Sequence, residues 1–375
     1  MCGKQLIVFC FLLLNFSVSK ADERFGAVGK FSIETNYQFG RIIPHNKKFK
    51  APVTDFTHSL EISFYKQTMG EKAWQRKLHY PEIGGSFVFA GNGDQQVFGN
   101  AYLFMIVSKF WIVRSRYVDF YLRVGTGLAV VPHPFDLVDN PKNNAIGSVL
   151  NSADQFRLGV DLKPHAQVHM SVGLTFTHYS NAGTQVPNLG VNVPALNIGI
   201  RYFPKVSAGL RYNRNRVPKP EKKNEVMIKL GVGYQESQTY YGPKYPIYIG
   251  TINFARYTSI ANKVLAGACV EFNQGNYDFN RIQEIDVKYS RVMDVTQFSI
   301  FVGDEILLGR VGLFFIAGGY IFPVRKDPPV YAKLGLNYYF PDFGKNKSRR
   351  FFIGTSLKTH YLAAQYYELS TGVAF

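Results

Sequence analysis

The chain has few of the features that stabilise small exported proteins or anchor helical membrane proteins. It contains only three cysteines among 375 residues, and two of them, Cys2 and Cys10, lie in its first ten residues. Apart from the apolar run Leu6–Leu14, no segment approaches the roughly 20 consecutive apolar residues that a membrane-spanning helix requires. A helical membrane protein is therefore excluded.

The N-terminus predicts export. Lys4 precedes the apolar run, and Ser19-Lys20-Ala21 offers small residues at the cleavage positions. This arrangement is typical of a secretory signal peptide, so we expect residues 1–21 to be removed and the mature chain to start near Asp22. Cys269 is then the one cysteine left, which excludes an intrachain disulfide framework and a cysteine metal cluster.

Acidic residues are also scarce. The chain has 26 Asp and Glu against 43 Lys and Arg, for a formal net charge of +17. Because an exported protein does not meet nucleic acid, this charge favours an anionic surface such as a phosphate-bearing lipid head group. We expect no cofactor and no metal: His165 and His169 have the i, i+4 spacing of helical zinc motifs, but they lie beside a strand-like segment.

Aromatic residues and glycine are abundant, with 32 Phe, 24 Tyr and 34 Gly. About sixteen segments, among them Phe31–Gly40, Gln167–Tyr179 and Val330–Tyr339, alternate apolar with polar or small residues, and turns separate them. Their lengths approach the 9–11 residues of a transmembrane strand. The sequence therefore predicts an all-β protein, an antiparallel transmembrane β-barrel of about 16 strands in the bacterial outer membrane.

The last predicted strand, Gln365–Phe375, alternates clearly and ends on an aromatic residue. A terminal aromatic residue after such a strand resembles the C-terminal signal of bacterial outer-membrane barrels. We therefore expect the barrel-assembly machinery to be a partner of this chain.

The chain also echoes itself. Phe176-Thr177-His178-Tyr179 recurs as Lys358-Thr359-His360-Tyr361, which suggests a duplicated eight-strand unit with halves at 22–204 and 205–375. In the second copy Leu362 stands at the position that corresponds to Ser180, so only the first half carries a candidate site. Because the basic, Pro-containing break at Arg214–Lys223 is short, a single barrel is favoured over two tandem eight-strand barrels joined by that linker.

The most informative stretch runs from Thr177 to Asn192. His178 and Ser180 are two apart at the end of a predicted strand, so they point to the same face and can act as base and nucleophile. The preceding residues of that face are all apolar: Val168, Met170, Val172, Leu174 and Phe176. In a membrane barrel this face contacts lipid, and the pair would meet a lipid at the membrane surface.

The motif His178-Tyr-Ser-Asn-Ala-Gly, followed after three residues by Pro187-Asn-Leu-Gly, resembles the active-site signature of PagL-type lipid A deacylases. The resemblance is close over 178–190 and extends over roughly 30–204 by strand pattern, whereas 205–375 lie beyond the typical family length. It implies an outer-membrane β-barrel esterase that removes an ester-linked acyl chain from lipid A, without a cofactor.

The resemblance also assigns roles. Ser180 matches the nucleophile and His178 the general base, while Asn188 matches a residue that helps to hold the oxyanion, and Asn181 the amide beside the nucleophile. The family's third catalytic member is a glutamate, and Asn192 stands at its position. An asparagine can accept the imidazole N–H but brings no charge, and in a serine protease the matching Asp-to-Asn change costs about four orders of magnitude.

Three consequences of Asn192 remain open from sequence. Either the enzyme tolerates a residue that orients the histidine only weakly, or another carboxylate such as Asp154 or Asp136 assists, or the activity has been lost. The rival to the esterase is a non-catalytic outer-membrane barrel, a porin or a structural protein with a relic site, because sixteen strands can enclose a channel.

Overall fold

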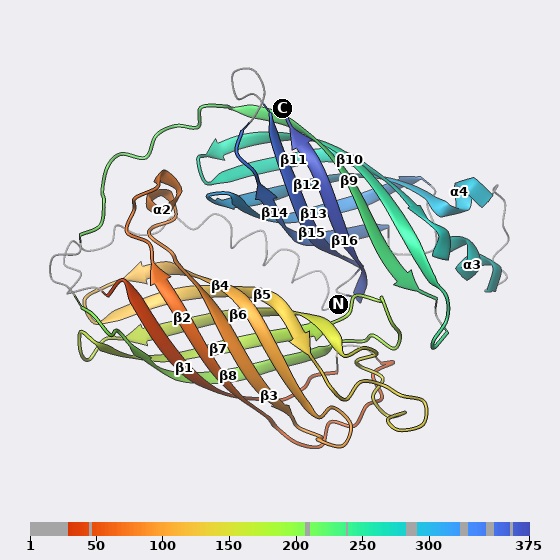
Figure 1. Cartoon of the computed structure of the whole chain (residues 1–375), viewed down its shortest axis with the longest axis horizontal. Coiled ribbons are helices and arrows are strands. Elements are labelled where there is room, and N and C mark those ends of the chain that lie inside the picture. Colours follow the sequence, from red (N-terminus) through yellow and green to blue (C-terminus); the bar gives the residue numbers. More distant parts are fainter. Residues whose placement is uncertain are drawn as a thin grey trace. The chain divides into compact units, whose positions relative to one another are not determined.

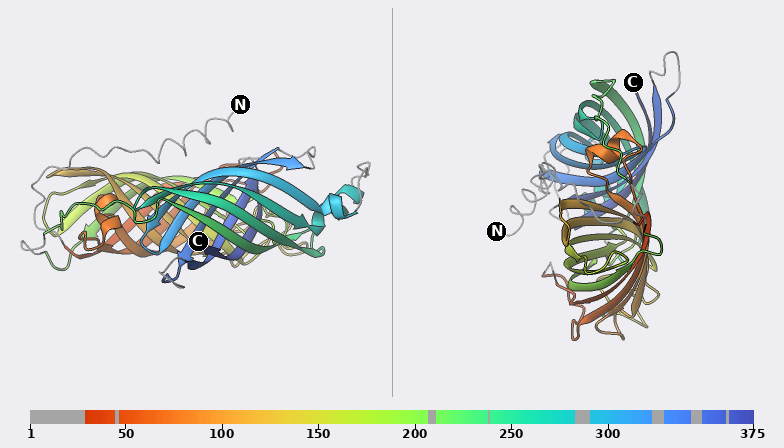
Figure 2. Two further views of the ribbon diagram at one scale, coloured as in Figure 1. Left: turned by 90° about the horizontal axis from the view of Figure 1, so that it is seen from above. Right: turned by 90° about the vertical axis from the view of Figure 1, so that its left-hand side faces the viewer.

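The computed structural model describes residues 29–44, 47–206, 211–237, 239–282, 291–322, 329–342, 349–360 and 363–375. The predicted signal peptide, residues 1–21, lies outside this range. The described chain is almost entirely β-structure, in two compact units (Figures 1 and 2). The first holds strands β1–β8 and continues through Asn215. The second holds β9–β16 from Arg216 onward, together with the short segments Lys72–Lys77 and Asn181–Asn188.

The first unit is a closed antiparallel barrel of eight strands. Its strands are β1 (Phe31–Gly40), β2 (Thr57–Gln67), β3 (Glu82–Asn92), β4 (Asn100–Arg114), β5 (Val118–Val130), β6 (Leu150–Leu162), β7 (Val168–Ser180) and β8 (Val191–Tyr202). A short helix, α2 (Ala73–Lys77), lies between β2 and β3 in sequence. The barrel closes where β1 pairs with β8, from Ile33 opposite Tyr202 to Gly40 opposite Ala195.

The second unit repeats this architecture. Its strands are β9 (Asn224–Glu236), β10 (Lys244–Ser259), β11 (Asn262–Asn273), β12 (Thr296–Leu308), β13 (Val311–Phe322), β14 (Val330–Tyr339), β15 (Arg350–His360) and β16 (Ala363–Ala374). Helices α3 (Gln274–Ile282) and α4 (Arg291–Val295) lie between β11 and β12 in sequence. This barrel closes where β16 pairs with β9, from Glu368 opposite Gly233 to Ala374 opposite Met227.

The prediction of sixteen antiparallel strands is confirmed, but the preference for a single barrel is wrong. β8 is hydrogen-bonded to β7 on one side and to β1 on the other, so it has no free edge to which β9 could add. Residues 211–223 form no strand. The chain thus has the tandem arrangement that sequence analysis left as the alternative, with the linker in the predicted place.

Both barrels turn apolar side chains outward. On β7 the predicted apolar face is exposed, with Leu174 64% and Val172 46% accessible, and in the second barrel Leu230 and Leu369 are each 65% accessible. Exposed apolar rows of this kind around a closed barrel are the lipid-facing belt of outer-membrane proteins. The chain is therefore an outer-membrane protein that spans the bilayer with strands. Within the described residues, no helix is long and apolar enough to cross a membrane.

The interiors are filled with paired charges. In the first barrel, Lys109 Nζ lies 2.9 Å from Glu34, and Glu61 bridges Arg123 and Arg157. Eight-stranded barrels are just wide enough for side chains to fill. These networks therefore close the first interior to solvent flow.

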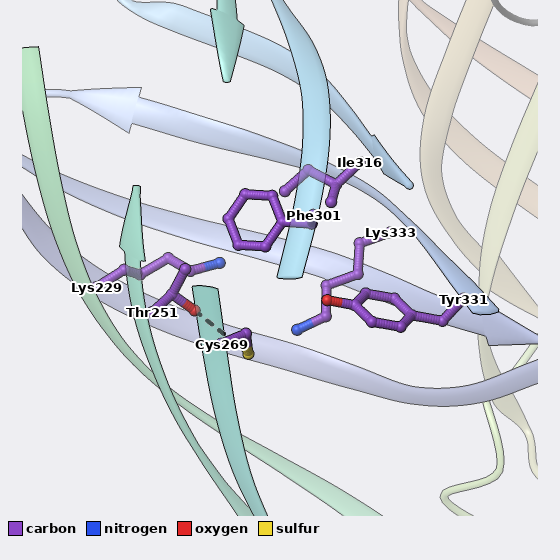
Figure 3. A pocket seen from close by; sticks show the side chains of 7 residues that line it. All are labelled: Lys229, Thr251, Cys269, Phe301, Ile316, Tyr331 and Lys333. Atoms are coloured by element: carbon purple, nitrogen blue, oxygen red, sulfur yellow. Dashed lines mark hydrogen bonds between the residues drawn. The ribbon is translucent and has the colours of Figure 1, made fainter. Parts of the chain in front are cut away.

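The second interior holds Lys–Glu pairs, such as Lys263 at 2.7 Å from Glu225 and Lys333 at 2.8 Å from Glu368. A small void remains near Cys269, whose sulfur accepts a hydrogen bond from Thr251 (Figure 3). Its volume is about 10 Å³, room for about one water molecule.

Candidate active site on the outer face of the first barrel

The candidate residues lie at one end of the first barrel. That end carries the connections 41–56, 93–99, 131–149 and 181–190. The opposite end carries the short turns 115–117 and 163–167 and the longer segment 68–81, which contains α2. Outer-membrane barrels place long loops outside the cell and short turns in the periplasm. The site therefore lies at the extracellular end, in the leaflet that faces outward.

Register brings His178, Ser180 and Asn192 together. His178 is directly opposite Asn192 across the β7–β8 pair, and Ser180 follows two residues later on the same face of β7. His178 Nε2 lies 3.0 Å from Ser180 Oγ, and His178 Nδ1 lies 2.7 Å from Asn192 Oδ1. Because an amide oxygen only accepts, Nδ1 carries the proton, so Nε2 is left to accept the serine hydroxyl.

Burial separates these groups from bulk water. Ser180 and Asn192 are buried, and His178 is half-buried at the edge of the apolar belt. Apolar side chains on the neighbouring outward positions, Phe176 and Leu196, remain exposed. The hydrogen-bonded pair of His178 and Ser180 thus stands on the lipid-facing side of the barrel wall, where an acyl chain can lie along the belt.

Glycine at 190 makes the close approach possible. Its φ is +73°, which L-residues rarely adopt, and an added Cβ would lie 2.8 Å from His178 Cε1 and 3.3 Å from Ser180 Cβ. Its N–H donates to Ala145 O at 2.9 Å, which fixes the loop end to the β5–β6 connection. Gly190 therefore leaves open the space beside the nucleophile.

The two other predicted asparagines lie in the β7–β8 loop. Asn188 Oδ1 accepts the backbone N–H of Asn181 at 3.0 Å, and Asn188 Nδ2 is buried with no hydrogen-bond partner among the described residues. The Asn181 side chain is used inside the loop: its Nδ2 donates to Gln185 O, and its Oδ1 accepts from Gly183 N. A buried N–H₂ without a partner can donate a hydrogen bond to an oxygen that comes within reach.

Of the two alternative carboxylates, only Asp154 is near the site. It lies on β6 directly opposite His178, within electrostatic reach of the imidazole. Asp136 instead lies in the β5–β6 connection, where its Oδ1 accepts the backbone N–H groups of Val138 and Asp139. Asp136 therefore holds its own turn.

Sequence reasoning missed Ser152 and Thr126. Ser152 lies opposite Ser180 and donates its hydroxyl to Ser180 O at 3.1 Å, while Thr126 lies opposite Asp154 on β5 and donates to its carboxylate. The available signal was parity: Ser152 and Asp154 stand on the outward row of β6 that continues through Phe156 and Leu158. Polar residues in a lipid-facing row indicate a site.

No metal cage accompanies this geometry. Among the described residues, no group of three or more His, Cys, Asp or Glu side chains is arranged to hold a metal ion. The chemistry that the site offers is that of a base, a hydroxyl and amide donors.

Solved structures similar to the chain include an outer-membrane enzyme, an outer-membrane protein and a porin. The crystal structure of the outer-membrane enzyme PagL is 19% identical, with a TM-score of 0.31, over 44% of this chain and 97% of that one. Omp33 from Acinetobacter baumannii has 6% identity and a TM-score of 0.16, over 93% of this chain and 99% of its own. A Rh. blastica porin variant has 11% identity and a TM-score of 0.18, over 92% and 98%. TM-scores of this size do not establish a common fold.

Family models match both halves of the chain. Residues 58–201 match the model described as Lipid A 3-O-deacylase (PagL), and residues 224–375 match that of the Acyloxyacyl hydrolase, C-terminal domain. A search of curated protein sequences finds no match. The expectation that 205–375 lie beyond the family is wrong, because the second barrel has its own family model. The chain therefore belongs to the PagL-type lipid A deacylase family.

Proposed function

We propose that this protein is an outer-membrane esterase that removes one ester-linked acyl chain from lipid A, with Ser180 as nucleophile and His178 as general base. The observation that carries the proposal is the hydrogen-bonded series from Ser180 through His178 to Asn192, built on the lipid-facing wall of the first barrel. Nucleophile, base and orienting group stand in the order that acyl transfer requires.

The location of the site supports the substrate. Lipid A belongs to the outer leaflet, and the site lies at the extracellular end of the belt. Three exposed lysines of the β1–β2 connection, Lys47, Lys48 and Lys50, stand at this end, and we name them the basic loop. Asn144 fixes this loop, because its Oδ1 accepts Lys50 N at 3.1 Å and its Nδ2 donates to Lys48 O at 2.7 Å. These cations suit the phosphates of a lipid A head group.

The reaction proceeds in two halves. Ser180 Oγ attacks the acyl carbonyl carbon while its proton passes to His178 Nε2, and the carbonyl oxygen becomes an oxyanion. The ester C–O bond then breaks, and the leaving alkoxide takes the proton from His178, which leaves an acyl-enzyme. Water adds to that ester as His178 takes a proton from it, and the fatty acid leaves as the proton returns to Ser180.

Asn188 is the proposed oxyanion donor, through the Nδ2 that has no partner within the described chain. Asn181 contributes by holding the loop that carries Asn188. Removal of one such donor from a serine hydrolase costs about 10²–10³ in kcat. Asn192 orients His178, the role that the family gives to glutamate.

The two halves have different roles in this proposal. Residues 22–204 form the catalytic barrel, and 205–375 form a barrel without a second site. The last strand, β16, is the proposed signal for the barrel-assembly machinery. The second candidate function, a non-catalytic barrel with a relic site, is favoured only by Asn192 in place of a glutamate. The charge-filled interiors speak against a porin.

The test is mass spectrometry of lipid A incubated in detergent micelles with refolded protein. Wild type is compared with Ser180→Ala and with the matched control Ser370→Ala, a half-buried serine of β16. We expect wild type and the control to remove one acyl chain, whose mass identifies it, and Ser180→Ala to remove none. Proteins that show the folded gel shift on heating, yet all leave lipid A intact, would overturn the esterase in favour of the relic barrel.

A further inference from the structure

Four outward-facing polar residues stand in one line across four strands of the first barrel. Thr126 on β5 is directly opposite Asp154 on β6, Asp154 is opposite His178 on β7, and His178 is opposite Asn192 on β8. We call these four the polar row. Directly opposite residues on antiparallel strands have Cβ atoms about 4.5–5.5 Å apart, so each side chain lies within interaction range of the next.

Asp154 occupies a lipid-facing position that an apolar residue ordinarily takes. It is half-buried on the lipid-facing side, and its strand continues outward with Phe156 and Leu158, which are 40% and 56% exposed. An ionisable residue on the lipid-facing side of a membrane strand is unfavourable, and the feature that sets Asp154 apart is its place directly opposite His178. Thr126 donates a hydrogen bond to its carboxylate, which keeps that carboxylate in place beside His178.

His178 in turn lacks a charged partner within hydrogen-bond distance. Its Nδ1 lies 2.7 Å from the neutral amide of Asn192, and its Nε2 lies 3.0 Å from Ser180. When His178 takes the serine proton it becomes an imidazolium, and an amide oxygen offsets that charge less than a carboxylate does. Asp154 faces His178 from the other side and interacts with it electrostatically.

We propose that two residues share the role of one catalytic carboxylate: Asn192 orients the imidazole of His178, and Asp154 supplies the negative charge that stabilises the imidazolium. This inference rests on the proposed function and deepens it. Asp154 acts through His178 and touches no reacting atom, so it is a positioning residue. The polar row then explains how an asparagine at position 192 is compatible with an active enzyme.

Among the residues around His178, Asp154 is the group that can supply a negative charge to the imidazolium. The outward residues nearest to His178 on the strands packed against β7 are Ser152, Asp154 and Phe156 on β6 and Asn192 and Pro194 on β8. Among these neighbours only Asp154 titrates. One opposite charge at about 5–6 Å and an effective dielectric constant near 20 changes a rate by somewhat more than about 100-fold, and solvent screening at this half-buried position lowers that to about 10- to 100-fold.

The experiment is a double-mutant cycle with lipid A in micelles: wild type, Asp154→Asn, Asn192→Glu and the double variant. We expect Asp154→Asn to lower kcat/KM by about 10- to 100-fold. The loss is expected in kcat with KM nearly unchanged, because the carboxylate acts on the imidazolium that forms during the reaction and not on lipid binding. In the Asn192→Glu background a charge is already present, so the same substitution changes kcat/KM by less than about threefold.

Two further variants separate charge from structure. Asp154→Glu keeps the charge and is expected to retain most of the activity. Asp304→Asn removes a half-buried outward carboxylate of the second barrel, which accepts a hydrogen bond from Asn262 at 2.6 Å. This variant is expected to leave both kcat and KM unchanged. Gel shift on heating verifies folding of every variant.

The outcomes are distinguishable. An active wild type with Asp154→Asn equal to it overturns this inference alone, and so does an equal loss in both backgrounds, which would mean that Asp154 and residue 192 act independently. If Asp154→Asn does not fold, Asp154→Glu and Asn192→Glu decide: Asn192→Glu must at least match wild type. A wild type no more active than Ser180→Ala overturns the proposed function itself.

Discussion

The two barrels carry the same short sequence echo on opposite faces of their walls. In the first barrel, His178 stands on the outward row with exposed Leu174 and Phe176. In the second, His360 shares its row with buried Ser356 and Lys358, and its Nε2 lies 2.8 Å from Tyr320 Oη. Strand parity alone thus decides whether a histidine meets lipid or becomes part of the barrel filling.

The interiors differ in chemistry although they solve the same problem. The first barrel pairs its glutamates mainly with Arg123, Arg157 and Arg201, whereas the second uses lysines such as Lys263 and Lys333. Arginine offers a planar fork to two acceptors, and lysine is a compact point charge. Interior charge is therefore common to both barrels, whereas the outward row of Thr126, Asp154, His178 and Asn192 belongs to the first.

The largest expected effect contrasts the two histidines. His178→Ala is expected to lower deacylation by about 10³–10⁶-fold, because the serine loses its base. His360→Ala is expected to leave kcat/KM unchanged, since its imidazole contacts Tyr320 inside the second barrel. The measurement is release of fatty acid from lipid A micelles at equal amounts of folded protein. Equal losses in the two variants would show that the second barrel takes part in catalysis.

An intermediate effect contrasts the interior networks. Glu61 bridges Arg123 and Arg157, and Glu368 lies 2.8 Å from both Lys229 and Lys333. Glu61→Gln and Glu368→Gln each leave two buried cations undercompensated, which costs about 3–5 kcal/mol. Because each barrel closes on its own strands, we expect Glu61→Gln to lower the heat stability of activity and Glu368→Gln to leave it near the wild-type value.

Gel-shift midpoints on heating, read beside residual activity, measure that contrast. Glu305→Gln is a second test of the interior network of the second barrel, since Glu305 lies 2.8 Å from Lys263. If all three variants lose activity at one lowered temperature, the barrels unfold as a single cooperative unit.

The smallest effect concerns the basic loop. Replacing Lys47 and Lys50 by alanine is expected to raise KM for lipid A by about 2- to 25-fold at low salt, since each lysine near an anionic surface contributes about 1 kcal/mol or less. The turnover number should not change, because neither side chain reaches the ester. Lys244→Ala, an exposed lysine at the start of β10, is the control. A salt-independent KM in all variants would exclude a role for these charges.

Much of the fold was predictable because strand alternation is a local property. β1 and β14 have the predicted bounds, Phe31–Gly40 and Val330–Tyr339, and the lipid-facing row of β7 is the one that parity indicated. The number of barrels was not predictable in this way. Closure depends on β8 meeting β1 across about 160 residues, and alternation says which face is apolar without saying which strand is the neighbour.

The candidate site likewise has one part that follows from the sequence of a single strand and another that depends on how the strands pair. His178 and Ser180 are two apart in one strand, so their shared face follows from sequence alone. The position of Asp154 opposite His178 depends on the register of β6 against β7, which the turn at 163–167 sets. The polar row therefore becomes visible only once the strands are paired.

The register of the first barrel also fixes the position of the Ser180 hydroxyl along the direction in which the strands cross the membrane. Ser180 is the last residue of β7, and each residue along a strand adds about 3.3 Å of length. The hydroxyl thus stands at a set level in the outer leaflet, held by hydrogen bonds on both sides of its strand. When a lipid diffuses sideways to the barrel wall, the ester that meets Ser180 is the one whose carbonyl lies at the same depth below the phosphate groups. The depth of an ester in the membrane then determines whether it is cleaved, and the position of Ser180 along its strand sets that depth.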